Sequence, residues 1–260
     1  MIARKSWVEK YAEWNRKWGS PAGLPTRKYV PRQLKLTTLG ARLVGPFSFQ
    51  PNNDTRGLEY PWAFEVLGPR QGMRVLDVGG SLAGLQFVLD RSGCEVVNVD
   101  PGEESRGRGW PVSEETFRRL NHAYGTSVTL KKCFLQDAGL EAESFDRVVS
   151  ISVLEHVPEN DIEAILIEAR RLLKPGGLMV LTLDLFLNVE PFAEAVNNEY
   201  GHNVSARWMV EKSGMEMVHG TRAELYGFDE FDAAAIRANG ELYASTKYPV
   251  MAQTLVLRKS

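Results

Sequence analysis

The chain has 260 residues, 43% hydrophobic and 25% charged, with a formal net charge of −2 at pH 7. This length fits one large domain, or a domain with an added cap, and can bury a full core. The balanced charge lacks the basic footprint of a nucleic-acid-binding protein. No apolar run approaches the roughly 18 residues of a membrane-spanning helix. Cys94 and Cys133 form neither a metal-ligand spacing nor a disulfide framework, which fits a reducing cytoplasm, so we expect a cytoplasmic protein in which nothing spans a membrane.

The N-terminal segment is rich in aromatic residues at helical spacing. Trp7, Tyr11, Trp14 and Trp18 are four, three and four positions apart, which places their rings on one face of a helix. This helix either packs on the main domain or forms a lid over a substrate pocket, and the two roles are compatible. We expect residues 1–62 to form a helical and loop cap.

A strand, a glycine turn, a helix and a second strand follow in residues 74–100. Arg74 to Val78 is a short apolar run that stops at Gly79 and Gly80, and a helical pattern leads to a second apolar run that ends at Asp100. This order predicts a βαβ unit with parallel strands. A backbone without side chains can approach a ligand closely, so Gly79 and Gly80 mark a candidate binding turn.

Asp100 is a candidate for binding the ribose of a nucleoside. It lies 21 positions after Gly79, at the carboxyl end of the second predicted strand. Open α/β sheets bind ligands at this edge, and a carboxylate there can accept hydrogen bonds from both ribose hydroxyls. The glycine pattern alone is also compatible with a tight turn that binds no nucleotide.

The rest of the chain continues the alternation of strands and helices. Ser113 is positioned to cap a helix that ends near Tyr124, and Asn160 or Asp161 to cap a later helix that Pro175 ends. Further helices are predicted at 191–200 and 204–212. Further strands are predicted at 128–133, 147–152, 178–183, 215–219 and 254–258. We expect residues 63–260 to be the main domain, with a second cap inserted at about 220–253 because the connection there is long.

With these elements in place, the sequence resembles the class I S-adenosylmethionine-dependent methyltransferases. The motifs that carry the resemblance are Val75 to Gly84, Asp100, Asp137, Ser144 to Val157 and Leu172 to Gly177. It covers roughly residues 65–220 and the last strand. It implies an α/β fold: a doubly wound, seven-stranded, mostly parallel Rossmann-like sheet with helices on both faces and an antiparallel last strand.

The resemblance also implies S-adenosyl-L-methionine as cofactor and a set of residues that bind it. Asp77 and Gly79, with Gly80 and Ser81 in the same turn, would hold the methionine end, and Asp100 the ribose. Gln136 and Asp137 would meet the adenine, and Ser150 and Ser152 would lie beneath the cofactor. The usual three glycines of the turn correspond here to Gly79, Ser81 and Ala83.

The catalytic candidates follow from the chemistry of methyl transfer. The cofactor carries the reactive carbon, so the protein aligns donor and acceptor, and needs a base only when the acceptor is protonated. His156, after the fourth strand, and His202, after the fifth, are candidate bases, although His156 could instead order its turn. Asp184 ends the fifth strand and could bind a substrate hydroxyl or a metal. No second carboxylate has a ligand-like spacing from it, so we predict no metal.

The enclosed, aromatic cap segments and the absence of a basic groove favour a small-molecule methyl acceptor, with oxygen preferred over nitrogen. Two alternatives remain open. The first is an S-adenosylmethionine-binding protein that is regulatory or catalyses a reaction other than methylation. The second is a nicotinamide-dependent oxidoreductase. The sequence leaves the acceptor and the oligomeric state open.

Overall fold

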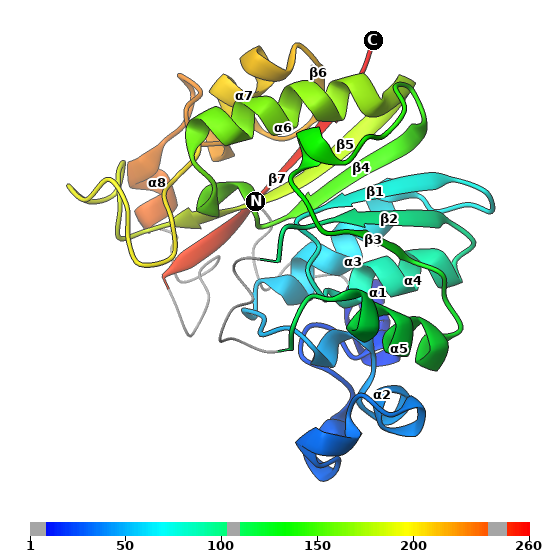
Figure 1. Cartoon of the computed structure of the whole chain (residues 1–260). Helices are drawn as coiled ribbons and strands as arrows, with labels where there is room; N and C mark the ends of the chain where they lie inside the picture. The colour runs from blue at the N-terminus through cyan, green and yellow to red at the C-terminus, as the bar shows by residue number, and fades with distance from the viewer. Residues whose placement is uncertain (1–8, 103–109, 239–248) are drawn as a thin grey trace. The chain divides into compact units, whose positions relative to one another are not determined.

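The computed structural model describes residues 9–102, 110–238 and 249–260, and the chain divides into two compact units, 8–139 and 140–260. Seven strands form a mostly parallel, doubly wound sheet of the expected class. The strand order is β3-β2-β1 in the N-terminal unit and β4-β5-β7-β6 in the C-terminal unit (Figure 1). Trp7 of the predicted aromatic face lies outside the described residues. No helix of the described ranges combines the length and the apolar composition needed to cross a bilayer.

The N-terminal unit contains the predicted βαβ unit and one further strand. Its strands are parallel, with Val75 opposite Val96 and Val97 opposite Thr129. Helices connect the strands, as parallel pairing requires. The elements are α1 (Glu9–Trp18), α2 (Thr38–Val44), α3 (Arg56–Leu67), β1 (Arg74–Val78), α4 (Gly84–Arg91), β2 (Glu95–Val99), α5 (Glu114–Tyr124) and β3 (Thr129–Lys131), with short 3-10 turns at η2 (Pro25–Tyr29), η3 (Arg32–Leu34), η4 (Pro46–Ser48) and η5 (Leu135–Asp137).

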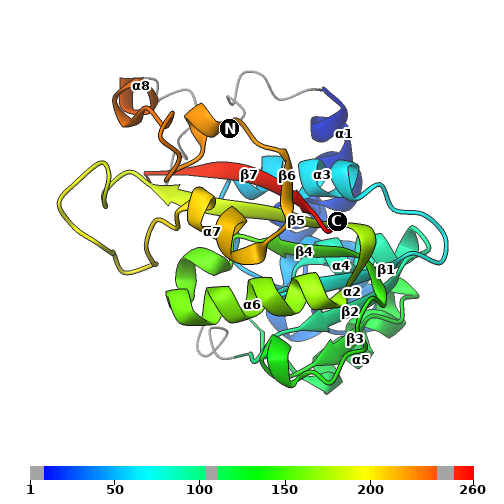
Figure 2. The ribbon, with the colours of Figure 1, turned by 90° about the horizontal axis from the view of Figure 1, so that it is seen from above.

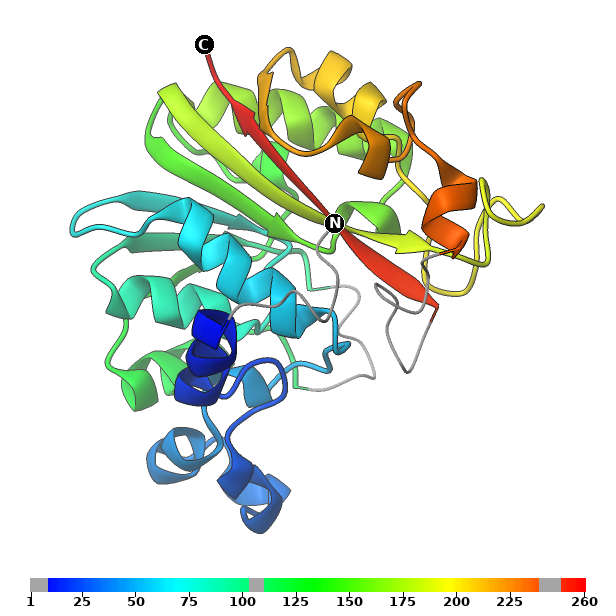
Figure 3. The same cartoon turned by 180° about the vertical axis from the view of Figure 1, so that it is seen from behind.

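Helix α1 docks on α3 at a point where α3 lacks an internal hydrogen bond. Pro61 lies inside α3 and has no N–H to donate to the carbonyl of Gly57. Asn15 of α1 donates its Nδ2 to that carbonyl at 2.6 Å. The Trp14 ring lies 5.6 Å from the Phe64 ring and 5.7 Å from the Phe47 ring. The ribbon of α1 lies beside that of α3 (Figure 3). The predicted aromatic face of the first helix therefore packs on the main fold.

The C-terminal unit combines one parallel pair with two antiparallel pairs. Strands β4 and β5 are parallel, whereas β7 runs antiparallel to both β5 and β6 (Figure 2). The elements are β4 (Phe145–Ile151), η6 (Leu154–His156), α6 (Glu159–Leu172), β5 (Leu173–Phe186), α7 (Ala206–Ser213), β6 (Glu216–His219), η7 (Arg222–Glu224), α8 (Ala233–Ala238) and β7 (Val250–Arg258). The antiparallel last strand agrees with the resemblance.

Three predictions of local structure in the C-terminal unit are wrong. Residues 191–200 form turns and an isolated bridge between Asn197 and His202, because Asn198 accepts the N–H groups of Tyr200 and Gly201 and so competes with a helix. Helix α6 begins after Pro158, with no side-chain cap. The last strand begins at Val250, so residues 250–253 belong to the sheet and not to the second cap predicted at about 220–253.

The predicted cap of α5 is confirmed. Ser113 has an extended backbone, and its Oγ accepts the N–H of Thr116 at 3.2 Å. We therefore expect Ser113→Ala to destabilise the protein by about 1 kcal/mol, because one N–H at the helix start loses its partner. The measurement is urea unfolding followed by circular dichroism. Ser113→Thr keeps the acceptor oxygen and should remain within a few tenths of a kcal/mol of the wild type. Equal losses in both variants would show that the hydroxyl has no capping role.

Candidate functional site

The turn after β1 admits no side chain at its second glycine. Gly79 has a φ of +72°, in the region that favours glycine. A Cβ on Gly80 would lie 2.4 Å from Oδ2 of Asp77, so a side chain there would displace this carboxylate. Ser81 has a φ of +42°, which is unusual for a residue with a Cβ. The turn is therefore a strained segment of backbone held against a buried acid.

Two buried amides hold this turn in place, and sequence reasoning missed both. Gln86, on α4, donates Nε2 to the carbonyls of Ser81 at 3.0 Å and of Ala83 at 2.9 Å. Asn98, on β2, donates Nδ2 to the Ser81 carbonyl at 2.9 Å and to Oε1 of Gln86 at 2.8 Å. Both side chains are fully buried. The one signal in the sequence was a polar residue, Asn98, within the run of valines from Val96 to Val99.

Asp100 closes the turn from the end of β2. Its Oδ2 accepts the N–H of Ser81 at 2.8 Å, and its Oδ1 accepts the N–H of Gly102 at 2.6 Å. A carboxylate has about four acceptor positions, so two N–H donors leave acceptor capacity for hydroxyl groups. The structure thus brings Asp77, Gly79, Gly80, Ser81 and Asp100 together in one unit.

Asp77 is a buried carboxyl group that titrates near neutral pH. Burial, with a smaller contribution from the negative charge of Asp100, raises the pKa of Asp77 to about 7. Helix α3 brings a buried ion pair to this region, in which Arg56 Nη1 lies 2.6 Å and 2.8 Å from the two oxygens of Glu59. Burial raises the pKa of Tyr60, on which the charges of Arg56, Glu59 and Asp77 also act. The start of α3 therefore belongs to the electrostatic environment of Asp77.

The predicted adenine contacts lie on the 3-10 turn that follows β3. Leu135 is buried, whereas Gln136 and Asp137 are exposed on the same turn. Phe134, which immediately precedes the turn, exposes 49% of its surface, a high fraction for an aromatic residue. Sequence reasoning did not single it out. An exposed ring beside two polar side chains can stack on a flat heterocycle while its neighbours form hydrogen bonds.

In the C-terminal unit the structure gathers the predicted catalytic residues around one glutamate. Glu155 follows β4 on η6 and is fully buried. Its Oε1 accepts the hydroxyl of Ser152 and, at 2.8 Å, the N–H of Asp184. Glu155, His156 and Asp184 each offer a ligand atom within 4.8 Å of the others. Glu155 lay in the motif after β4, but sequence reasoning assigned it no role. It is the second carboxylate beside Asp184, which the spacing along the sequence did not reveal.

Ser150 and Ser152 are both buried at the end of β4. Ser152 has a φ of +52°, so the chain turns sharply there. Its hydroxyl donates to Glu155 and thereby orients that carboxylate. The structure therefore gives Ser152 a positioning contact within the protein, in addition to the cofactor contact that the resemblance implies.

The loop after β5 orients the ring of His156. Nδ1 of His156 bonds the carbonyl oxygen of Tyr200, which only accepts, so Nδ1 carries a proton. In the neutral ring Nε2 is then the unprotonated nitrogen. Gly201 allows this approach, because a Cβ there would lie 2.1 Å from the carbonyl oxygen of Glu155. The N–H of His202 donates to that same carbonyl at 3.0 Å.

His202 is the more enclosed of the two candidate bases. Burial lowers the pKa of its imidazole, and the charge of His156 lowers it further, against the opposing effect of Glu159. Its Nε2 is buried and has no hydrogen-bond partner among the described residues. The other two histidines lie elsewhere, His122 exposed on α5 and His219 on β6, where its Nε2 is 3.4 Å from Thr254 Oγ1.

The cluster around Glu155 has two chemical uses. An imidazole with a free Nε2 beside two carboxylates can accept a proton, because the carboxylates stabilise the cation that forms. Two carboxylates and one imidazole also form a donor set that a divalent cation such as Mg²⁺, Mn²⁺ or Zn²⁺ can use. The prediction that the protein needs no metal stays a prediction.

Comparison with known proteins agrees with this geometry. Residues 76–181 match the family described as a methyltransferase domain. The chain is 34% identical over 142 residues to a ubiquinone biosynthesis O-methyltransferase of Cereibacter sphaeroides. That match covers 55% of this chain and 50% of the relative, so the chain spans about half the length of this curated protein.

Solved structures with low sequence identity share the fold. The 1,6-didemethyltoxoflavin-N1-methyltransferase of Burkholderia thailandensis, solved with 1,6-didemethyltoxoflavin and S-adenosylhomocysteine bound, is 15% identical, with a TM-score of 0.56 and coverage of 80% of each chain. The [4+2]-cyclase SpnF is 17% identical, with a TM-score of 0.57, covering 92% of this chain and 99% of that one. One fold thus carries more than one reaction.

The residues present fit S-adenosylmethionine. The turn has no side chain at Gly79 or Gly80, Asp77 supplies a buried carboxyl group for a cationic group, and Asp100 has acceptor capacity for ribose hydroxyls. The sheet topology, these side chains and the matching domain agree. Residues 76–181 match the methyltransferase domain family, and the sheet has the fold of solved S-adenosylmethionine-dependent methyltransferases.

Proposed function

We propose that the protein transfers a methyl group from S-adenosylmethionine to an oxygen of a small molecule. The observation that carries the proposal is the cluster of Glu155, His156 and Asp184, which offers a proton acceptor beside two carboxylates. A hydroxyl must lose its proton when it is methylated, so an oxygen acceptor gives this cluster a role. The similarity to a ubiquinone biosynthesis O-methyltransferase also supports oxygen over nitrogen.

In the proposed mechanism each group of residues has one task. S-adenosylmethionine supplies the electrophilic methyl carbon. Asp77 holds the charged amino group of the methionine end, and Asp100 holds the ribose. Gln136 and Asp137 contact the adenine, beside the exposed ring of Phe134.

On the acceptor side, Nε2 of His156 takes the proton of the acceptor hydroxyl. Glu155 and Asp184 stabilise the imidazolium that results, and the Tyr200 carbonyl keeps the ring oriented. His202 is the alternative base. Its lowered pKa keeps it neutral and able to accept a proton at pH 7.

We propose two caps on the methyltransferase domain of 63–260, one at 1–62 and one inserted at about 220–253. In the C-terminal unit, Leu185 at the end of β5 forms a buried apolar cluster with Phe192, Ile236 and Met251. Leu185 directly follows Asp184 in β5. The inserted segment thus packs on the strand end that carries a candidate catalytic residue.

Methyl transfer is tested with isotopically labelled S-adenosylmethionine and a panel of phenols, catechols and amines, with RNA and protein as further acceptors. The proposal expects label in a hydroxylated small molecule. Label in RNA or protein alone would overturn the assignment of the acceptor. Binding of S-adenosylmethionine without transfer to any acceptor would favour a regulatory or non-methylating protein.

We expect Asp100→Asn to weaken the binding of S-adenosylhomocysteine by about tenfold or more. The amide loses the negative charge and one acceptor oxygen, so it cannot serve Ser81, Gly102 and a ribose together. Binding is measured by isothermal titration calorimetry. Asp161→Asn, an exposed acid on α6, is the matched control and should bind like the wild type. Unchanged affinity in Asp100→Asn would exclude the ribose contact.

We expect S-adenosylhomocysteine to bind about tenfold more tightly at pH 8 than at pH 6. With a pKa of about 7, Asp77 is mostly protonated at pH 6, so a cationic amino group must displace that proton on binding. The affinity therefore rises with pH and levels off above pH 7. Titrations in two buffers of different ionisation enthalpy should show proton release at pH 6. Asp77→Asn should bind weakly at both pH values, and a wild type without pH dependence would place Asp77 away from the charged group.

We expect His156→Gln to lower kcat/KM by a factor of about 10² to 10⁴, the usual contribution of a general base, with unchanged affinity for S-adenosylhomocysteine. His122→Gln removes an exposed imidazole from α5 and should leave the rate unchanged. The assay is run before and after treatment with EDTA. Activity that EDTA abolishes and Mg²⁺ restores would assign the cluster to a cation and contradict the general-base role.

A further inference from the structure

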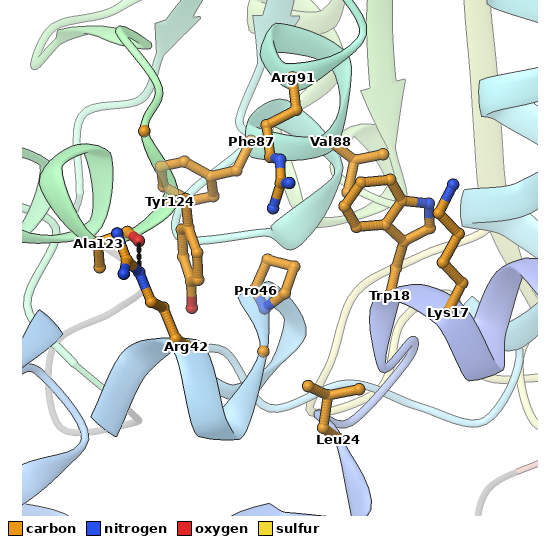
Figure 4. A pocket seen from close by; sticks show the side chains of 12 residues that line it. Lys17, Trp18, Leu24, Arg42, Pro46, Phe87, Val88, Arg91, Ala123 and Tyr124 are labelled. Carbon is orange, nitrogen blue, oxygen red and sulfur yellow. Dashed lines mark hydrogen bonds between the residues drawn. The ribbon is translucent and has the colours of Figure 1, made fainter. Parts of the chain in front are cut away.

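The N-terminal unit contains a pocket lined by α1, α2, α4 and the end of α5 (Figure 4). Its volume is about 400 Å³, within the range of small-molecule sites. Helix α4 starts at the glycine turn, and the pocket lies against its other end, at Phe87, Val88 and Arg91. Seven residue steps of helix separate Gly84 from Arg91, or about 10 Å. The pocket is therefore distinct from the turn that binds the cofactor.

Three cationic side chains line this pocket, and no acidic residue does. They are Lys17, Arg42 and Arg91, one from each of three helices. Among the described residues none of the three forms an ion pair. Arg42 instead donates Nε to the carbonyl of Ala123 at 2.7 Å, which leaves the rest of its guanidinium available. Three cations without counter-charges repel one another, and an anion between them would relieve that repulsion.

Aromatic and apolar side chains form part of the pocket wall. Two of the cations lie over the Trp18 ring. Lys17 Nζ is 5.0 Å and the Arg91 guanidinium carbon 5.4 Å from the ring centroid. Figure 4 shows Arg91 reaching down between the Trp18 ring and the Tyr124 ring, above Pro46. Cation–π contacts orient both charges beside an aromatic surface. A ligand that suits these walls has an aromatic or apolar body as well as its negative charge.

The charge distribution along the sequence supports an anionic ligand. Between Glu13 and Asp54 the chain has seven Lys and Arg residues and no acid, although its net charge is −2. Lys17 and Arg42 belong to this stretch. Leu39 and Leu43, on either side of Arg42 in the sequence, expose 69% and 42% of their surfaces. Exposed apolar side chains therefore lie near Arg42 along α2.

We propose that this pocket binds a phosphate group attached to an aromatic or apolar body. The three cations neutralise the phosphate, and Trp18, Pro46 and Tyr124 contact the body. The same chemistry is available from a free phosphorylated metabolite and from the head group of an anionic lipid.

The test uses 1-naphthyl phosphate with the full-length protein, by isothermal titration calorimetry. The wild type should bind it, and Arg91→Gln should bind about tenfold more weakly, because one charge-assisted contact is lost. Lys28→Gln is the matched control, since it removes a charge from the same acid-free stretch but does not line the pocket. Its affinity should stay within about twofold of the wild type. Equal weakening in the two variants would mean diffuse attraction and overturn the proposal.

Two further arms identify the source of the phosphate and the role of the body. Vesicles of phosphatidylglycerol, compared with phosphatidylcholine, are sedimented with each variant, and binding that Arg91→Gln loses and Lys28→Gln keeps would support a lipid head group. Inorganic phosphate should bind more weakly than 1-naphthyl phosphate. Equal binding of the two phosphates, or no binding of either compound or of the vesicles by the wild type, would overturn the proposal.

Discussion

The N-terminal unit depends on how the strained backbone after β1 is held in its conformation. Ser81 keeps a positive φ because several neighbours fix it: Asp100 accepts its N–H, and Asn98 and Gln86 donate to its carbonyl. Strained backbone of this kind persists only where the surroundings over-determine it. A glycine, the usual residue at this position, would adopt a positive φ without strain. Here the buried hydrogen bonds stabilise that conformation at Ser81, so a glycine is unnecessary. Asp100, the acid proposed to bind the ribose, thus also shapes the turn beside it.

The C-terminal unit repeats this arrangement with other residues. Ser152 has a positive φ directly after β4, and the buried Glu155 accepts its hydroxyl and the N–H of Asp184. Gly201 then lets the loop after β5 approach the carbonyl of Glu155, which brings His202 close and allows the Tyr200 carbonyl to orient His156. In both units a buried polar side chain at a strand end fixes a strained residue, and the functional groups project from the fixed backbone.

The sequence predicted the order of the elements well, because hydrophobic periodicity and the residues that begin or end an element are local properties. The apolar run before Gly79, the capping Ser113 and the break near Pro175 each depend on residues within one turn or strand. The helix predicted at 191–200 failed because Asn198 satisfies the backbone locally. The role of Glu155 and the pairing of Gln86 with Asn98 could not be predicted, since each partner lies in a different element and only the fold brings the two together.

The electrostatics of the turn explain why a cationic nucleoside suits it better than a dinucleotide. In nicotinamide-binding folds the turn after the first strand holds an anionic pyrophosphate on backbone N–H groups. Here the Asp77 carboxyl occupies the space above Gly80, and Asp100 already binds the N–H of Ser81. A phosphate at this position would meet two acids, one of them with a pKa raised by burial and by the other's charge. A ligand with an amino group and a sulfonium instead offsets the cost of ionising Asp77, so the same two acids that exclude a pyrophosphate favour S-adenosylmethionine.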